Sequence, residues 1–206
     1  MPPTTQLDLG RIVLVPVFAC FVLLNVMKLI DNDDRTVVAT LGTIAALSFN
    51  AALAVMYLRR GVASHTDRRP KVWLVAGAAT FSPFAIPVVA SHEAGPVASF
   101  AGALLVVLGI GLAIWALLSL NTNISVVPQA RELATTGPYR FFRHPLYVFE
   151  YVAAIGLVLV SGGGWGWLVV AALGVLQVLR ARWEERLLRE EVAGYAAYAS
   201  RTPGFS

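Results

Sequence analysis

The sequence predicts an all-α integral membrane protein with about six transmembrane helices. Three observations support this fold class: hydrophobic residues make up 57% of the chain, charged residues make up only 14%, and the apolar residues gather in long runs. A soluble domain carries roughly 25% charged residues, and the mean hydropathy of this chain is +0.70. The net charge of +4 is spread over several loops and the C-terminus, so we expect no nucleic-acid partner.

The first four apolar runs are each long enough to cross a hydrocarbon core of about 30 Å. The first run has no small-residue cleavage site, so we interpret it as a retained helix rather than a signal peptide. The third run contains Pro83 and Pro87, and we expect it to be bent or broken there. These runs cover residues 12–30, 37–58, 72–90 and 97–120.

Two shorter apolar runs, 145–160 and 165–179, are separated by a glycine-rich turn and predict a helical hairpin. Runs of this length leave open whether the hairpin crosses the membrane completely or stops short of the far surface. After Leu179 opposite charges recur at i,i+4 spacing without a helix breaker. The sixth helix is therefore expected to continue into the cytoplasm and to end near Pro203.

Basic residues in the loops predict the orientation of the chain. Lysine or arginine occurs five times in 59–71, three times in 121–144 and five times from Arg180 onward. Segments 31–35 and 91–95 together hold one basic residue. The positive-inside rule then places both termini and the 121–144 segment in the cytoplasm. We divide the chain into four helices in 1–120 and a functional core in 121–206.

The sequence does not suggest a metal site or a disulfide. Its one cysteine, Cys20, lies within an apolar run, and its three histidines are scattered, whereas a tetrahedral metal site needs four grouped ligands. The small-residue spacing of Gly102, Gly109 and Gly111 is expected to serve packing within the chain rather than a dimer contact. The oligomeric state stays open.

The segment "GPYRFFRHPLYVFE", residues 137–150, places polar residues directly ahead of the fifth apolar run. Pro145 suits the first position of a helix, so the backbone N–H groups of Leu146 and Tyr147 would be free of helical acceptors. Just upstream are Arg140, Arg143 and His144. Cationic side chains beside a helix N-terminus predict a binding site for a carboxylate or a phosphate.

Acidic residues lie near the same membrane surface. Glu150 follows one turn inside the fifth helix, and Glu184 and Glu185 lie where the sixth helix leaves the membrane. A glutamate facing lipid is costly, so we expect Glu150 to face the bundle interior and a partner. The same residues also allow a structural interpretation, in which aromatic and basic side chains anchor the interface and Arg143–Glu150 or Arg180–Glu184 are structural ion pairs.

The run "NISVVPQARELATTGPYRFFRHPLY", followed by "EERLL" and then "YAAYASRTPGF", resembles the isoprenylcysteine carboxyl methyltransferase and phospholipid methyltransferase family. The resemblance covers roughly 121–205. It implies an integral membrane enzyme that uses S-adenosylmethionine and transfers a methyl group to a lipophilic, isoprenoid-like or lipid-like acceptor. It also implies a bacterial inner membrane location, with the active site facing the cytoplasm and membrane lipids as its surroundings.

The resemblance assigns roles to residues of the C-terminal core. Arg143, His144 and the N–H groups after Pro145 would hold the carboxylate of S-adenosylmethionine. Glu184 and Glu185 would take its ammonium group or ribose hydroxyls, and Arg180 would meet the acceptor. The remaining implied cofactor contacts come from the segment that closes over the pocket and from the residues around the arginine-histidine motif: Gln129, Leu133, Gly137, Pro138, Tyr139, Arg140, Leu146 and Tyr147.

The acceptor chemistry remains open between two classes. A carboxylate acceptor needs only a positioning arginine, Arg143 or Arg180, whereas an amine, hydroxyl or thiol must lose a proton, for which Glu150 is the candidate base. Two other functions compete with methyl transfer. One is an isoprenoid or sterol reductase that uses NADPH, which would normally be longer, and the other is a non-catalytic membrane scaffold or transporter.

Overall fold

The computed structural model describes residues 9–31, 36–61, 65–90, 94–130 and 133–205. Within them, long apolar helices dominate, because a helix satisfies its backbone polar groups internally and can therefore lie in lipid. The α-helices are α1 (Leu9–Ile30), α2 (Val37–Arg59), α3 (Pro70–Phe81), α4 (Pro96–Leu120), α5 (Pro145–Val160), α6 (Gly166–Glu191) and α7 (Tyr195–Ala199). The remaining elements are the 3-10 turns η1 (Ser82–Ala85), η2 (Asn121–Asn123) and η3 (Gly137–Arg140) and the two-residue strands β1 (His65–Thr66) and β2 (Gln129–Ala130).

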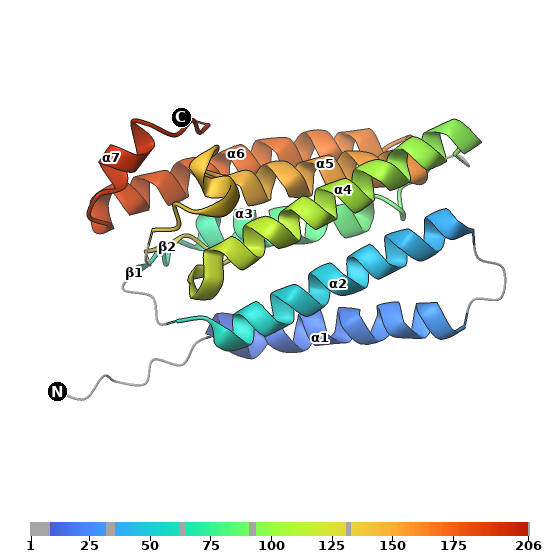
Figure 1. Ribbon diagram of the computed structural model, residues 1–206, viewed down its shortest axis with the longest axis horizontal. Helices are drawn as coiled ribbons and strands as arrows, with labels where there is room; N and C mark the ends of the chain where they lie inside the picture. The colour runs from blue at the N-terminus through green and yellow to red at the C-terminus, as the bar shows by residue number, and fades with distance from the viewer. Residues whose placement is uncertain (1–8, 32–35, 62–64, 91–93, 131–132, 206) are drawn as a thin grey trace.

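The long helices run side by side along the longest axis of the molecule (Figure 1). Helices α1 and α2 form one pair, α4 crosses between this pair and α5, and α6 lies next to α5. Helices α2, α4 and α6 finish at the end where α5 begins, and α7 folds back across that end. We call this end, formed by residues 133–144 and 180–205, the polar end.

Four of the described helices are long and apolar enough to cross a membrane: α1, α2, α4 and α6. This is fewer than the six spans expected from the sequence. Helix α5 is apolar but has only 16 residues. The third apolar run, expected as a span over 72–90, forms the 12-residue α3 and then the turn η1. Pro83 lies in η1, where its ring prevents the α-helix from continuing.

The sixth helix is shorter than predicted at its C-terminal end. Helix α6 does continue past the apolar run, but it ends at Glu191 rather than near Pro203. Gly194 has a φ of 83°, a left-handed conformation that glycine adopts without steric cost. The chain therefore turns at this residue, and α7 begins as a separate short helix directed back over the polar end.

Glycines allow α4 and α5 to pack at close range. A Cβ added at Gly102 would lie 2.6 Å from the carbonyl oxygen of Gly156, and one added at Gly109 would lie 2.7 Å from the backbone nitrogen of Ala153. Side chains at these positions would push the two helices apart. Gly111 is different, because no atom lies within 4 Å of its added Cβ. Gly102 and Gly109 thus serve contacts within the chain, as the sequence predicted.

Two buried clusters of apolar side chains hold the helices together. The first joins α1, α2 and α4 through residues that include Phe18, Tyr57 and Leu117. The second joins α3, the residue after η1, α5 and α6 through residues that include Ile86 and Leu173. Strands β1 and β2 form a small antiparallel pair, His65 opposite Ala130 and Thr66 opposite Gln129, which ties the loop after α2 to the segment after α4.

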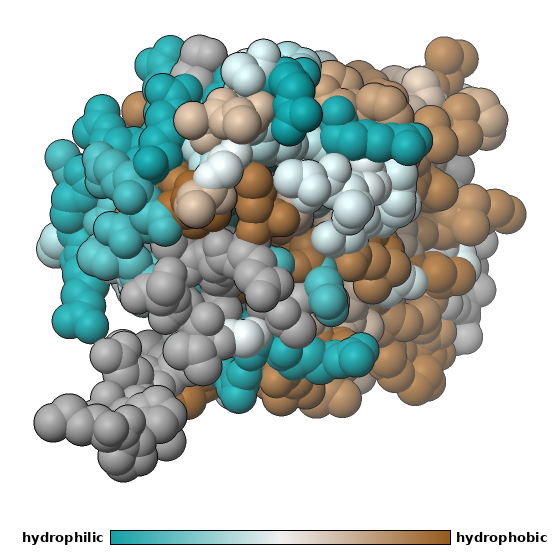
Figure 2. Space-filling model, turned by 60° about the vertical axis from the view of Figure 1, so that its left-hand side comes forward, coloured by the Kyte–Doolittle hydropathy of each residue, from teal (hydrophilic) through white to brown (hydrophobic). Residues whose placement is uncertain are grey.

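The surface of the molecule changes character along its length. In the space-filling view, hydrophilic residues gather toward the polar end and hydrophobic residues cover the part behind it (Figure 2). Exposed side chains on the apolar part include Leu24, Leu104 and Leu168. A band of exposed aliphatic side chains next to a polar surface is the arrangement expected of helices in a bilayer.

Candidate active site

The candidate site begins at the N-terminus of α5. His144 precedes the helix as its N-cap, with φ −129° and ψ 55°, and Pro145 occupies the first helical position. The first helical hydrogen bond runs from the Val148 N–H to the His144 carbonyl, at 3.3 Å. The N–H groups of Leu146 and Tyr147 come before this bond, so they belong to the donor end of the helix dipole.

Glu185 binds both members of the adjacent arginine-histidine pair. Its carboxylate forms an ion pair with Arg143 Nη1, and its Oε1 lies 2.9 Å from His144 Nε2. Arg189 Nη2, one turn further along α6, lies 3.5 Å from the same carboxylate. The side chains of Arg143, His144 and Glu185 are only 7%, 5% and 3% exposed. Because charges so deeply buried must be paired, this cluster fixes the start of α5 against α6.

Glu184 has a different environment from its neighbour. Its side chain is 31% exposed, and its Oε2 accepts a hydrogen bond of 2.8 Å from the Tyr147 hydroxyl. The Tyr147 ring stacks on the His144 ring, with centroids 5.5 Å apart. Glu184 therefore keeps an accessible carboxylate at the site, whereas Glu185 is enclosed by its cationic partners.

Arg180 lies deeper in the bundle, with only 4% of its surface exposed. Its guanidinium lies 4.6 Å from the centre of the Tyr147 ring. Arg180 Nη1 donates to Gln177 Oε1 at 3.1 Å, and Nη2 donates to the Val126 carbonyl at 2.8 Å. Its Nε has no hydrogen-bond partner among the described residues. Gln177 in turn donates to Glu150 Oε2 at 3.0 Å, so Gln177 connects Glu150 to Arg180.

The ion pairs proposed as a structural alternative are not those that form. Arg143 pairs with Glu185 and not with Glu150. Arg180 binds neutral groups, and no ion pair joins it to Glu184 in the described part of the chain. Sequence spacing allowed an Arg180–Glu184 pair because the residues are one turn apart on α6, but Arg180 lies over the Tyr147 ring and Glu184 accepts from the Tyr147 hydroxyl.

The C-terminal segment covers the polar side of this cluster. The Tyr198 hydroxyl donates to the Tyr139 carbonyl at 2.6 Å, and the Arg143 N–H donates to the Pro203 carbonyl at 2.9 Å. The ring of Phe205 stacks on His144, with centroids 5.8 Å apart. Burial raises the pKa of Tyr198 to about 12. Its phenol therefore stays protonated and able to donate at neutral pH.

Tyr139 lies within the same group of side chains. It is buried in the 3-10 turn η3, and its pKa is raised well above the ordinary value, first by burial and then by the nearby Glu184 carboxylate. Gly137 begins this turn with a φ of 59°, and an added Cβ would collide with the Ser119 side chain. Pro138 is fully buried beside it. Helix α4 thus fixes the turn that positions Tyr139.

Three residues of the expected cofactor contacts lie elsewhere. Gln129 lies in β2 and donates to Thr66 Oγ1 at 3.0 Å. Leu133 is half-buried between β2 and η3. Arg140 is exposed, and its guanidinium lies 4.5 Å from the centre of the Phe141 ring. Gln129 and Arg140 thus contact residues outside the arginine-histidine cluster.

The structure adds residues that the sequence analysis did not name. Gln177 is the polar residue one turn before Arg180 on an otherwise apolar stretch of α6, and that position was a usable signal. Val126 and Tyr57 carried no such signal. The Val126 N–H donates to the Tyr57 hydroxyl at 2.6 Å, so this contact depends on how α2 meets the segment after α4. Within the described residues, no group of three or more histidine, cysteine, aspartate or glutamate side chains suits a metal ion.

A comparison with protein families finds a match over the part of the chain that builds this site. The model of the phospholipid methyltransferase family matches residues 97–193, which run from the start of α4 to just beyond α6. Residues 97–193 belong to the phospholipid methyltransferase family. With the four long apolar helices, this family of membrane proteins identifies the chain as an integral membrane protein.

Two curated bacterial proteins are similar to part of this chain. The nickel-cobalt-cadmium resistance protein NccN of Alcaligenes xylosoxydans xylosoxydans is 35% identical over 78 residues, which is 37% of each chain. The cobalt-zinc-cadmium resistance protein CzcN of Cupriavidus metallidurans is 36% identical over 74 residues, 35% of this chain and 34% of that protein. The matched stretch thus spans little more than a third of either relative.

Proposed function

We propose that this protein is an S-adenosylmethionine-dependent methyltransferase that acts on a lipophilic acceptor at the cytoplasmic surface of a bacterial inner membrane. One observation carries the proposal. Within the phospholipid methyltransferase region, α5 and α6 bring Arg143, His144 and Tyr147 together with Glu184 and Glu185 at the polar end. The donor S-adenosylmethionine has a carboxylate, an ammonium, a sulfonium and a ribose, and so needs both acidic and basic partners.

The residues of the site fit such a donor. Glu184 is the carboxylate with room for a ligand, since its side chain is 31% exposed and the Tyr147 hydroxyl is its one short hydrogen-bond donor in the described residues. It would take the ammonium or the ribose hydroxyls. The α5 N-terminus and Arg143 would face the carboxylate, and the rings of Tyr139 and Tyr147 suit contact with a sulfonium.

Glu185 has a supporting role in this assignment. Its carboxylate is enclosed by Arg143, His144 and Arg189, so it positions those side chains rather than receiving a ligand. The sequence alone could not assign different roles to the two neighbouring glutamates. Their different burial, 31% exposed for Glu184 and 3% for Glu185, separates them.

The bound donor would supply an electrophilic methyl group, and the protein must align the acceptor and exclude water. Arg180 is suited to orient an acceptor, because its Nε is buried and has no partner among the described residues. Glu150 is held by Gln177 and can accept a proton from an acceptor amine, hydroxyl or thiol. A carboxylate acceptor has no proton to lose, so only an amine, hydroxyl or thiol acceptor would need Glu150 as a base.

The donor is tested by calorimetric titration of the purified full chain in detergent with S-adenosylhomocysteine and, separately, with NADPH. We expect a saturable response to S-adenosylhomocysteine and none to NADPH. A response to NADPH alone would instead favour the reductase function. No binding response to either compound would favour a scaffold or transporter. Incubating lipid extracts with radiolabelled methyl donor would then identify the class of acceptor.

Variants test the roles of the two residues that face the donor. Tyr147→Phe removes the hydroxyl that binds Glu184 and keeps the ring, and Glu184→Gln removes the negative charge. Each should weaken S-adenosylhomocysteine binding about tenfold, because a hydrogen bond to a charged group contributes roughly 1.5–3 kcal/mol. Glu191→Gln, an exposed change at the end of α6, is the matched control and should bind normally. Normal binding by both site variants would contradict the assignment.

A further inference from the structure

The outward side of α6 changes from aliphatic to basic along one line. Leu168 and Val175 are 60% and 62% exposed, and Arg182 and Arg186 are exposed as well. An α-helix turns 100° per residue, so Arg186, eighteen residues after Leu168, projects in the same direction. Arg182 follows Val175 by seven residues and lies close to the same line. The lipid-facing side of this helix therefore leads directly into two arginines.

The depth of these arginines matches the edge of the hydrocarbon. Helix α6 begins at Gly166, and twenty residues of helix separate it from Arg186. At 1.5 Å per residue this distance is about 30 Å, which equals the thickness of the hydrocarbon core. A side chain on the lipid-facing line at this height lies beside phospholipid headgroups. Arg182, one turn earlier, can extend to the same level.

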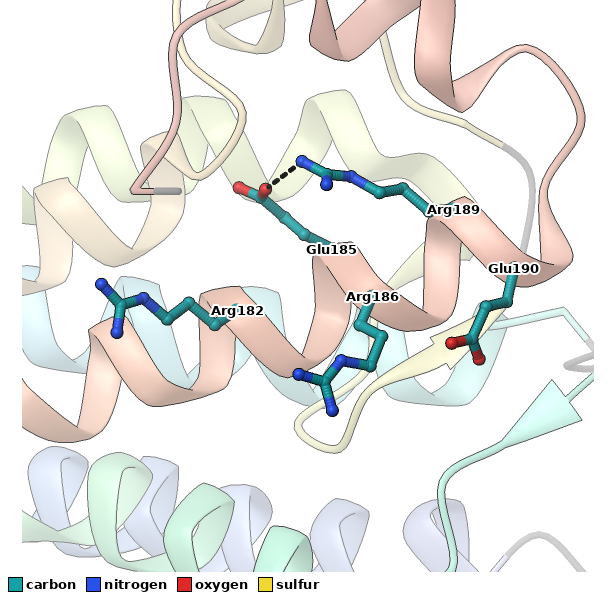
Figure 3. Close-up of a pocket in the computed structure, with 5 residues that line it drawn as sticks. All are labelled: Arg182, Glu185, Arg186, Arg189 and Glu190. Atoms are coloured by element: carbon teal, nitrogen blue, oxygen red, sulfur yellow. Dashed lines mark ion pairs between the residues drawn. The ribbon is translucent and has the colours of Figure 1, made fainter.

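The two arginines form one wall of a surface pocket. The pocket has a volume of about 320 Å³ and is lined by Arg182, Glu185, Arg186, Arg189 and Glu190. Figure 3 shows Arg182 and Arg186 extending along the same side of α6, whereas Arg189 turns toward Glu185. Glu185 is paired with Arg143, His144 and Arg189.

Arg182 and Arg186 differ from the other charged residues of the pocket. Neither forms an ion pair or a hydrogen bond with another side chain in the described ranges, and Glu190 makes no ion pair with Arg186 there although it lies one turn away. Two unpaired guanidinium groups thus face an open pocket next to lipid. Guanidinium groups bind phosphate oxygens in a two-pronged geometry, more specifically than ammonium groups do.

We propose that this pocket binds the headgroup of an acidic phospholipid, with Arg182 and Arg186 holding the phosphate and the acyl chains lying along Leu168 and Val175. The continuous line from aliphatic to basic side chains favours a lipid over a soluble anion, because a soluble anion would have no use for the aliphatic part. The excess of basic over acidic residues favours an acidic lipid over a zwitterionic one. Arg182 and Arg186 lie outside the contacts assigned to the methyl donor, and Glu185 borders both sites.

The proposal is tested by native mass spectrometry of the full chain, titrated with phosphatidylglycerol and, in parallel, with phosphatidylcholine of the same acyl chains. The test variant is Arg182→Ala with Arg186→Ala. The matched control is Arg59→Ala with Arg68→Ala, which removes two exposed arginines at the same end of the molecule but outside the pocket. Thermal unfolding of each variant checks that the fold is retained.

The wild-type protein and the control are expected to bind phosphatidylglycerol in preference to phosphatidylcholine. The test variant should lose about tenfold or more of its affinity for phosphatidylglycerol, since each basic residue near an acidic membrane surface is worth about one power of ten or slightly less. Added salt should weaken the wild-type binding. Equal binding of both lipids, or equal loss in the test and control variants, would overturn the proposal. A test variant that unfolds would be replaced by the single change Arg182→Ala, judged by the same criteria.

Discussion

His144 Nε2 lies 2.9 Å from Glu185 Oε1, and both side chains are almost completely buried. These residues are 41 positions apart in the chain, on α6 and at the start of α5, and Arg143 binds the same carboxylate. The contact joins the polar residues ahead of α5 to a helix that is apolar over most of its length. It is one of the contacts that hold the start of α5 against α6.

Replacing Glu185 is predicted to destabilise the protein more than replacing Glu184. Glu185→Ala leaves buried Arg143 without its acidic partner, and breaking a buried ion pair in this way costs about 3–5 kcal/mol. Glu184→Ala removes a partly exposed side chain with one hydrogen bond to Tyr147, which costs about 1 kcal/mol. Thermal unfolding in detergent measures both effects. Equal melting temperatures for the two variants would contradict the different roles assigned to the glutamates.

Tyr57→Phe is predicted to lower stability and to affect the site from a distance. The Tyr57 side chain is fully buried, and its hydroxyl accepts the Val126 N–H, while the Val126 carbonyl accepts from Arg180. Leaving this N–H without a partner costs about 1–3 kcal/mol. Tyr151→Phe is the control, because the Tyr151 hydroxyl has no hydrogen bond in the described residues. Unfolding temperature should fall for the first variant and change little for the second.

The same pair of variants can show whether Tyr57 positions Arg180. Loosening Val126 should raise the KM for the methyl acceptor while leaving the binding of S-adenosylhomocysteine unchanged, because Arg180 is assigned to the acceptor. An unchanged KM in Tyr57→Phe would limit this residue to a structural role.

Gly102→Ala is predicted to destabilise the contact between α4 and α5. The new methyl group would lie 2.6 Å from the Gly156 carbonyl oxygen, and overpacking of this kind costs about 1–3 kcal/mol. Gly111→Ala provides a control on the same helix, since its Cβ meets no atom within 4 Å and alanine is the better helix former. The melting temperature should fall for Gly102→Ala and should not fall for Gly111→Ala. A Gly102 variant as stable as the wild type would mean that the helices can move apart freely.

Asp67 is predicted to make a pH-dependent contribution to stability. Hydrogen bonds from Arg69 hold the pKa of this carboxyl below its ordinary value, so folding favours the charged form. The stabilisation is then complete above about pH 4, the ordinary aspartate range, and is lost as the pH falls through the lower pKa of the folded state. The difference in melting temperature between the wild type and Asp67→Asn should therefore be largest at neutral pH and shrink under acid conditions. A constant difference across this range would contradict the prediction.

The sequence predicted several local features because each depends on neighbouring residues. Pro145 marked the first turn of α5, and the length of the apolar runs indicated α1, α2 and α4 as spans. Pro83 also marked the break in the third run, where α3 ends and η1 follows. The run was still counted as a span, because its hydropathy continues past the break. Similarly, charge spacing could not indicate that Gly194 would end the last helix early.

The sequence by itself determined that this chain builds apolar helices with a cluster of charged and aromatic residues at one end, because hydropathy, helix length and proline position act locally. Only the tertiary structure decided which charges meet. Arg143 lies near Glu150 in the chain but pairs with Glu185, and Glu150 reaches Arg180 through Gln177. These partners depend on how α5 and α6 are rotated and offset against each other, and that packing is set by contacts distributed over the whole length of the helices.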